Sequence, residues 1–199
     1  MSDATTPARG TGLPTLGDLP WVPALERPDL LAAPTLAALR AWAERDERAA
    51  AQVAVAEIDP DHADTATLND VHGLPPAASA NCVLVAGRRG QDERIAACIV
   101  PATTFADVNT RVRKLLDARK ASFLPQDRAT GESGQEYGGI GPLGLPEAWR
   151  VLVDARFAEP GALALQGSGV RRSKILMTGE LLCSLPGVEV VDDLGVERG

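Results

Sequence analysis

A glycine-rich stretch between Gly131 and Gly144 is the part of the sequence whose residue types most directly suggest chemistry. It contains six glycines, and its centre, Tyr137-Gly138-Gly139-Ile140-Gly141-Pro142, has neither strand nor helix periodicity. Because glycine has no Cβ and adopts positive φ, successive N–H groups can converge on a carbonyl oxygen, a carboxylate or a phosphate. The stretch lacks the Lys-Ser/Thr ending of a nucleotide P-loop, and it does not follow a strand as a dinucleotide fingerprint does. Taken alone, it predicts either an ordinary loop or a loop that binds such an oxygen.

A second glycine turn, Gly167-Ser168-Gly169, leads into a short basic segment that ends at Lys174. Local cations of this kind can contact phosphates, but the formal net charge of -7 argues against strong non-specific binding of nucleic acid. For the cluster from Arg111 to Lys120, a solvated helix face is the more common meaning. The two basic clusters are Arg171, Arg172 and Lys174, and Arg111, Arg113, Lys114, Arg119 and Lys120.

Metal and nucleophile chemistry find little support in the sequence. The only histidines are His62 and His72, and the three cysteines, Cys82, Cys98 and Cys183, are widely spaced in apolar surroundings. This pattern predicts reduced, buried thiols, and neither a zinc site nor a Ser-His-Asp triad is easily built from it. We therefore expect no metal and no cofactor.

The length and the apolar segments predict one domain in the cytoplasm. A chain of 199 residues supports a single sizeable core. The apolar runs are far shorter than the roughly 20 residues that a membrane span requires. The first residues also lack the pattern of a secretory signal, which favours a cytoplasmic protein with no membrane contact.

Strands interleaved with helices predict an α/β domain with a mixed sheet. The expected strands are 53–58, 82–86, 94–100, 121–124, 150–153, 162–166, 174–177 and 188–191, with a long loop over 87–93. The expected helices begin near Pro34, at Asp64 or Thr65, at Thr104 or Asp107, at Pro125 and at Thr178, and Gly73 should end the second of them.

The chain divides into three parts by composition. Residues 1–33 are rich in Pro, Gly and Thr, which predicts a flexible tail that cannot bury enough apolar surface to order itself. Residues 34–52 carry Leu36, Leu39 and Ala43 at helix spacing and predict an N-terminal helix. Residues 53–196 are expected to form the functional domain.

The order of these motifs resembles the YbaK/prolyl-tRNA editing domain family. The stretch from Tyr137 to Pro146 is similar to the family's Gly-x-x-x-Pro loop, with Gly138 and Pro142 at its two fixed points. Val151–Asp154 looks like the family's next strand with its terminal Asp, and Gly167–Lys174 is similar to its glycine and arginine turn. Together with Leu68–Pro76 and Asn81–Val85, the resemblance covers residues 53–194.

The resemblance implies an aminoacyl-tRNA deacylase, a carboxylic ester hydrolase that removes a small amino acid, such as Ala or Cys, from a mischarged tRNA. Such an enzyme is needed because a synthetase pocket discriminates poorly against slightly smaller side chains. The implied fold is a single domain with a mixed, curved β-sheet approaching a barrel, surrounded by helices. The implied partner is the 3′ end of an aminoacyl-tRNA, together with a synthetase or another tRNA-bound protein.

Backbone N–H groups of Gly138 to Gly141 would hold the ester carbonyl oxygen as it gains charge, so that no side-chain nucleophile is needed. The implied catalytic residues are Asn81, Gly138, Gly139 and Gly141, and the implied substrate-binding residues are Tyr137, Ile140, Pro142, Asp154, Ser168 and Lys174.

Asn81 departs from the family pattern, because a typical member has a functional Lys at this position. An asparagine can orient a carbonyl or a ribose by hydrogen bonds but supplies no cation. Lys174 could supply that charge from the second glycine turn. The alternative is a non-catalytic binding module that keeps the pocket for an amino-acid-like ligand or a protein partner.

Overall fold

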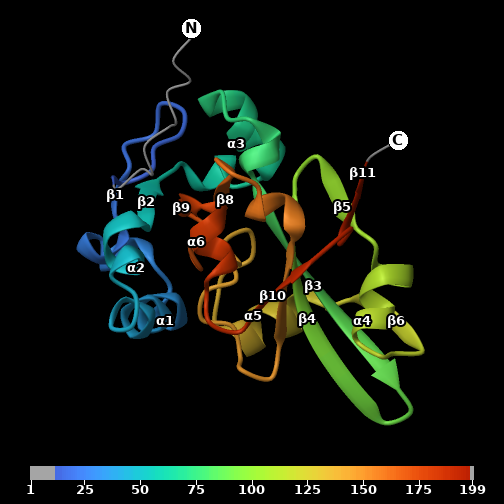
Figure 1. The fold of residues 1–199 in the computed structure, drawn as a ribbon. Coiled ribbons are helices and arrows are strands. Elements are labelled where there is room, and N and C mark those ends of the chain that lie inside the picture. Colours follow the sequence, from blue (N-terminus) through green and yellow to red (C-terminus); the bar gives the residue numbers. More distant parts are fainter. Residues whose placement is uncertain (1–11, 198–199) are drawn as a thin grey trace, which may run out of the picture.

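Two main β-sheets, flanked by short helices, form the molecule (Figure 1). The structure is a computed structural model that describes residues 12–197. Its strands are β1 (Val22–Pro23), β2 (Ala54–Glu57), β3 (Ala80–Arg89), β4 (Asp92–Pro101), β5 (Thr104–Ala106), β6 (Lys120–Phe123), β7 (Arg150–Asp154), β8 (Leu163–Gly167), β9 (Ser173–Thr178), β10 (Val188–Val191) and β11 (Gly195–Glu197). Its α-helices are α1 (Ala33–Ala43), α2 (Glu47–Gln52), α3 (Thr65–His72), α4 (Arg113–Leu115), α5 (Gln126–Ser133) and α6 (Gly179–Cys183).

The first sheet is antiparallel and the second is mixed. The first has the order β1-β2-β9-β8, and the second has the order β10-β7-β4-β3-β6 with β7 parallel to both of its neighbours. A parallel bridge between Ser79 and Leu165 joins the two sheets. The predicted single mixed α/β domain is confirmed, although within residues 12–197 the sheets do not close into a barrel.

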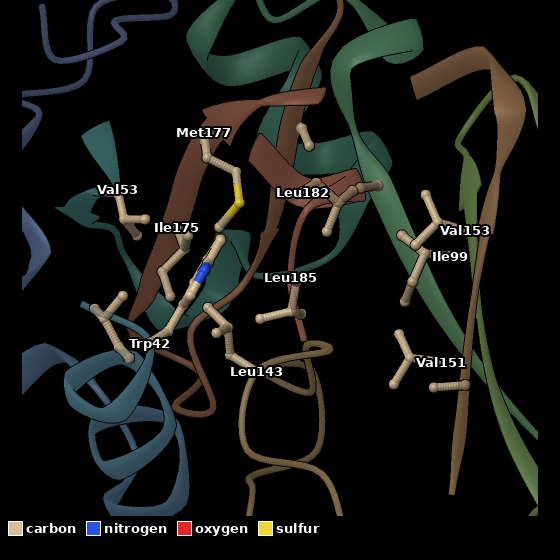
Figure 2. Close-up of a cluster of buried hydrophobic side chains, with 14 of the residues drawn as sticks. Trp42, Val53, Ile99, Leu143, Val151, Val153, Ile175, Met177, Leu182 and Leu185 are labelled. Carbon is tan, nitrogen blue, oxygen red and sulfur yellow. The ribbon is translucent and has the colours of Figure 1, made fainter. Parts of the chain in front are cut away.

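The largest core cluster lies between the two sheets (Figure 2). Ile175 and Met177 of β9 face it together with Trp42 of α1, whereas Leu176 between them packs in a second cluster with Leu68 of α3. This alternation follows from the two-residue period of a strand, and it shows that both faces of β9 are covered. Figure 2 shows Leu182 and Leu185 between β9 and the strand pair that carries Ile99 and Val153.

Helix α3 follows the predicted capping pattern. Asp64 accepts hydrogen bonds from the amides of Ala66 and Thr67 at 3.0 and 3.2 Å, which satisfies two free donors of the first turn. Gly73 ends the helix with a φ of 60°, a left-handed conformation that suits glycine. The prediction for this element is confirmed.

The hairpin of β3 and β4 is longer than the sequence predicted, and the expected long loop over residues 87–93 is wrong. The ladder continues to the pair Arg89 and Asp92, so the turn consists of Gly90 and Gln91. Gly90 has a φ of 64°. The polar residues at this end pair across the strands, as Arg88 Nε donates to Glu93 Oε1 at 3.0 Å, so the ladder extends without an apolar pattern.

The helix expected from Thr104 begins only after Asp107. Thr104 Oγ1 donates to the Pro101 carbonyl oxygen at 2.9 Å, and residues 104–106 form β5, which pairs with β11. Asp107 caps a π-helical turn over Val108–Val112 by accepting from the Thr110 amide at 3.0 Å, and this turn leads into α4. The apolar spacing correctly predicted a helical turn, but the first residues of the expected helix pair instead with β11 near the C-terminal end of the chain.

The N-terminal region also differs from the prediction. Residues 12–33 are not an unpacked tail where the structure describes them, because Ala24 and Leu30 have no exposed surface and Trp21 is buried. The expected helix over 34–52 is two helices, since Asp46 accepts from the Arg48 amide at 3.0 Å and caps α2. The part of the tail prediction that concerns residues 1–11 lies outside the described residues.

Candidate functional site

A cavity of about 590 Å³ opens where the two sheets separate beyond the bridge between Ser79 and Leu165. The start of β3 and the end of β8 form two of its walls, and the start of α3 and the two glycine loops form the rest. Its lining residues are Ala63, Asp64, Thr65, Leu68, Ser79, Ala80, Asn81, Cys82, Val83, Tyr137, Gly138, Ile140, Leu165, Gln166, Gly167, Arg171 and Lys174.

The wall formed by β3 presents unpaired backbone to this cavity. In an antiparallel ladder, both backbone groups of a residue point to the same neighbouring strand, and the direction alternates along the chain. The Ser79 carbonyl accepts from Ala102 on the β4 side, and the Leu84 carbonyl accepts from Leu124 on the opposite side, both at 2.9 Å. By this alternation the N–H and C=O of Cys82 point away from β4, where β6 does not reach because its pairing begins at Val85.

Lys174 places a buried ammonium group in the cavity. Its side chain projects from β9, and the residue is only 7% exposed. Nζ donates to the Ala63 carbonyl at 3.0 Å and to the Gly138 carbonyl at 3.4 Å. The pKa of Lys174 is lowered from 10.5 to about 8, mainly by burial and also by the Arg171 cation, while the Asp64 carboxylate opposes both effects.

Asn81 lies on the same cavity, at the start of β3. Its Oδ1 accepts a hydrogen bond from Thr65 Oγ1 at 2.8 Å, which fixes the amide against α3. The sequence indicated Thr65 only as a possible helix cap and gave no sign of its contact with Asn81. The cavity therefore has a buried cation on β9 and a neutral amide at the β3 position.

Arg171 covers the loop that carries Gly138. Its Nε donates to the Pro60 carbonyl at 3.0 Å, and its backbone amide donates to Glu136 Oε2 at 2.7 Å. A Cβ on Gly138 would lie 2.5 Å from Arg171 Nη1, and the φ of 82° at this position also favours glycine. The sequence placed Arg171 in a basic turn but gave no sign that it borders the pocket.

The two glycine loops pack on each other through their backbones. The Gly169 amide donates to the Gly139 carbonyl, and the Glu136 amide donates to the Gly169 carbonyl, both at 2.8 Å. A Cβ on Gly141 would clash with the Gly167 carbonyl oxygen. At several of these positions glycine is needed because the two chain segments lie too close together for a side chain.

Hydrogen bonds within the first glycine loop remove two amides from the expected oxyanion site. The Gly139 amide donates to the Glu136 carbonyl at 2.9 Å, and the Gly141 amide donates to Gln135 Oε1 at 2.8 Å. Neither residue lines the cavity. Among residues 12–197, the amides of Gly138 and Ile140 donate to no protein acceptor, and both residues border the cavity.

Three further residues expected to bind substrate lie away from the cavity. Pro142 is buried behind the loop. Asp154 is 1% exposed and accepts from the amides of Arg156 and Gly195 at 3.0 and 2.7 Å, so it joins β7 to β11. Ser168 is fully buried, and its Oγ lies 2.7 Å from Ser173 Oγ, which fixes the turn between β8 and β9. A sequence shows that such residues follow a strand or turn, but not which side they face.

Cys82, Cys98 and Cys183 are free thiols, and Cys82 borders the cavity. Burial raises the pKa of Cys82 and raises that of Cys98 to about 12.

No group of three or more His, Cys, Asp or Glu side chains that could hold a metal ion occurs in residues 12–197. Within the same described range, no helix is long and apolar enough to cross a membrane.

Known proteins share this architecture. The structure is similar to the hypothetical protein APE2540, with a TM-score of 0.66 and 13% identity, over 79% of this chain and 99% of that one. It is also similar to a candidate trans-editing enzyme for prolyl tRNA synthetase, with a TM-score of 0.64 and 16% identity, over 85% of this chain and 99% of that one. A search of curated proteins gave no match.

At these identities the structural likeness establishes the fold. A family model for the aminoacyl-tRNA editing domain matches residues 59–183, which is more than half of the chain and includes every lining residue of the cavity. The chain therefore belongs to the aminoacyl-tRNA editing domain family.

Proposed function

We propose that this protein is an aminoacyl-tRNA deacylase that hydrolyses the ester between a small amino acid and the 3′ ribose of a mischarged tRNA. The observation that carries the proposal is the buried ammonium of Lys174 in an open cavity of an editing-domain fold. A cation at this place can attract a tRNA phosphate or stabilise the charge that an ester oxygen gains during hydrolysis.

The reaction needs only water and groups that stabilise an oxyanion. Water adds to the ester carbonyl carbon, the bond to the ribose oxygen breaks, and the products are the free amino acid and the ribose hydroxyl. The donors available at the cavity are the amides of Gly138, Ile140 and Cys82, together with Lys174 Nζ. Removing one donor of this kind costs about 2.7–4 kcal/mol of transition-state stabilisation in a well-studied case.

The rim of the cavity suits the end of a tRNA. Tyr137 is 60% exposed beside the cavity, which allows a nucleotide base to stack on its ring. The Arg171 guanidinium lies over Gly138 and provides a positive charge for a phosphate. Asn81, held by Thr65, can orient a ribose hydroxyl or the ester carbonyl through its free amide N–H groups.

A binding module without catalysis is the second candidate function. It is favoured by the contacts of Lys174, because two of its three donors are already used by backbone carbonyls. In that case the cavity would bind an aminoacyl ligand or a protein partner without turning it over. Contact with a synthetase and a cytoplasmic location remain predictions under either function.

The test is deacylation of Ala-, Cys- and Ser-charged tRNAs, each on cognate and proline-type acceptors. The parent protein should exceed the spontaneous rate with at least one substrate, and both Asn81→Ala and Lys174→Met should lower kcat/KM. Thermal unfolding of each variant shows whether a loss reflects the site or the fold. If the protein binds the charged tRNAs but hydrolyses none of them, the result would favour the binding module.

A further inference from the structure

The basic cluster between Arg111 and Lys120 is not confined to one helix face. Arg111 lies in the π-helical turn and Lys114 in α4, but Lys120 begins β6, the edge strand of the mixed sheet. Asp117, with a φ of 49°, turns the chain between the helix and the strand. The cations therefore gather around a tight turn at the edge of a sheet, and not along the side of one helix.

Three cations of this cluster are available to a ligand. Lys114, Arg119 and Lys120 are exposed, and among residues 12–197 their side chains form no ion pair and no hydrogen bond. The only carboxylate of the stretch, Asp117, forms ion pairs with two arginines of the β3–β4 hairpin. The other two arginines of the cluster donate to backbone carbonyls. The charge of the three exposed side chains is thus not neutralised by the protein.

These cations adjoin the cavity along one edge of β3. Strand β6 pairs with this edge over Val85–Arg88, and the Leu124 amide donates to the Leu84 carbonyl at 2.9 Å. Nearer the start of β3 the same edge is open, and there residues 81–83 line the cavity. The cavity and β6 therefore lie end to end beside β3. From the cavity wall to the far end of the pairing the distance along β3 is ~17 Å, the length of a few stacked nucleotides.

Phe123 lies between the cavity and the cations. It is 67% exposed, although it belongs to a strand. Its cross-strand partner is Val85, so its ring is on the face of β3 that also carries Val83, a lining residue of the cavity. An exposed ring beside cations is typical of surfaces that bind a nucleic-acid strand, because bases stack on the ring while Lys and Arg contact the phosphates.

Charged residues on an edge strand can instead protect it from pairing with another chain. Two observations favour a ligand. An exposed phenylalanine on the edge works against such protection, because apolar edges promote pairing. The cluster is also positive in a chain whose net charge is -7, so the positive charge is concentrated where a polyanion leaving the cavity would pass.

We infer that β6 and the turn before it bind the RNA strand that leads from the ester in the cavity to the body of the tRNA. The inference rests on the proposed function, since it adds a second contact surface for the same substrate. The terminal nucleotide is at the cavity, a base further along stacks on Phe123, and Lys114, Arg119 and Lys120 contact phosphates beyond it. Because phosphate contacts carry no sequence information, this surface raises affinity for tRNA in general, and the cavity selects the amino acid.

The experiment measures binding of an uncharged tRNA transcript by fluorescence anisotropy at several salt concentrations. The double variant Arg119→Gln with Lys120→Gln should raise Kd about tenfold or more at ~0.1 M salt. It should also make the slope of log Kd against log salt shallower by about 1.5–2, because two phosphate contacts no longer release counterions.

The matched control is Arg40→Gln with Arg45→Gln, which removes the same charge at α1. Both arginines are exposed and, among residues 12–197, form no ion pair. Figure 1 shows α1 on the side of the molecule away from α4 and β6. The control should keep the parental slope and a Kd close to the parental one.

Phe123→Ala tests the stacking contact separately. It should raise Kd about fivefold or more at every salt concentration without changing the slope, since stacking on a base releases no counterions. Thermal unfolding of all variants checks that each is folded, which the exposure of these side chains favours.

A parental affinity and slope in the Arg119 and Lys120 double variant would overturn the inference and leave these cations as protection of the edge strand. An equal loss in the α1 control, or a parent protein that does not bind tRNA, would overturn it as well. Binding of uncharged tRNA requires no hydrolysis, so the outcome is separate from that of the proposed function. If no ester is hydrolysed but the slope falls as expected, the inference stands and only the enzyme is removed.

Discussion

Lys174 shows how one buried charge can make the proposed activity depend on pH. Its pKa of about 8 means that the ammonium loses its proton within a range accessible to tRNA assays. If the cation stabilises the ester oxygen, deacylation above the spontaneous rate should fall as the pH rises through about 8. Lys174→Arg should lack this falling limb, because the guanidinium stays charged.

The stability of the protein should change in the opposite direction over the same range. Between pH 8 and 10.5 the unfolded chain binds more protons at Lys174 than the folded chain does, because the folded pKa is the lower one. The free energy of unfolding contributed by this residue therefore rises with pH in that window. Urea denaturation of the parent and Lys174→Met at pH 7.5 and 10 checks the sign, and an advantage of the parent over the variant that shrinks at the higher pH would contradict it.

Two buried glutamines, Gln135 and Gln166, give a third prediction at the residue scale. Gln135→Met should lower the free energy of unfolding by about 1–3 kcal/mol, because it leaves the buried Gly141 amide without a partner and removes one of the two donors to the Leu143 carbonyl. Gln166→Met should be neutral or stabilising, since it removes an amide oxygen that has no hydrogen-bond partner among residues 12–197. Chemical denaturation of both variants measures the difference, and a larger loss in Gln166→Met would mean that its amide is satisfied.

Single residues were only partly predictable from the sequence. Asn81, Gly138, Tyr137, Ile140 and Lys174 do border one cavity. The other expected site residues lie away from the cavity, because a motif fixes the order of residues along the chain but not the side to which each side chain points. Gln166 went unnoticed for a related reason. A polar residue within an apolar strand gives no sign of whether its amide finds a partner.

At the scale of elements, contact between the two glycine loops determines the shape of the site. Gly141→Ala should be strongly destabilising, by about 2–5 kcal/mol, because its Cβ would overlap the Gly167 carbonyl oxygen and neither backbone can move independently. The matched control is Gly131→Ala in α5, where a Cβ meets nothing within 4 Å. That change should stabilise the helix by about 0.5–1 kcal/mol. Thermal unfolding of the pair provides the measurement, and similar values would refute the packing argument.

Elements with strong local signals were predicted well, and those that depend on distant pairing were not. Helix α3 has its capping Asp64 and its terminal Gly73 within one short stretch, so local chemistry determines it. Strand β5 forms because Thr104–Ala106 pairs with Gly195–Glu197, nearly a hundred residues later. No periodicity within the first segment shows that such a partner exists.

At the scale of the whole molecule, the N-terminal segment supports the site from behind. The Leu30 carbonyl accepts from Ser173 Oγ at 2.6 Å, and the Ala32 amide donates to the Ser168 carbonyl at 3.2 Å. Thr35 Oγ1 donates to the Leu143 carbonyl at 3.3 Å. Figure 1 shows this part, with α1 and α2, along the side of the molecule opposite the long β3–β4 hairpin. The family model begins only at residue 59, so the N-terminal residues that make these contacts lie outside the matched region.

Leu30 tests whether this segment is part of the core. It is fully buried and packs in the largest cluster, so Leu30→Ala should lower the free energy of unfolding by about 2–5 kcal/mol. Leu25, only partly buried on the same cluster, is the control, and Leu25→Ala should cost less. Urea denaturation of Leu30→Ala and Leu25→Ala measures the two losses of stability. Two equally mild losses would mean that the N-terminal segment lies on the domain without supporting it.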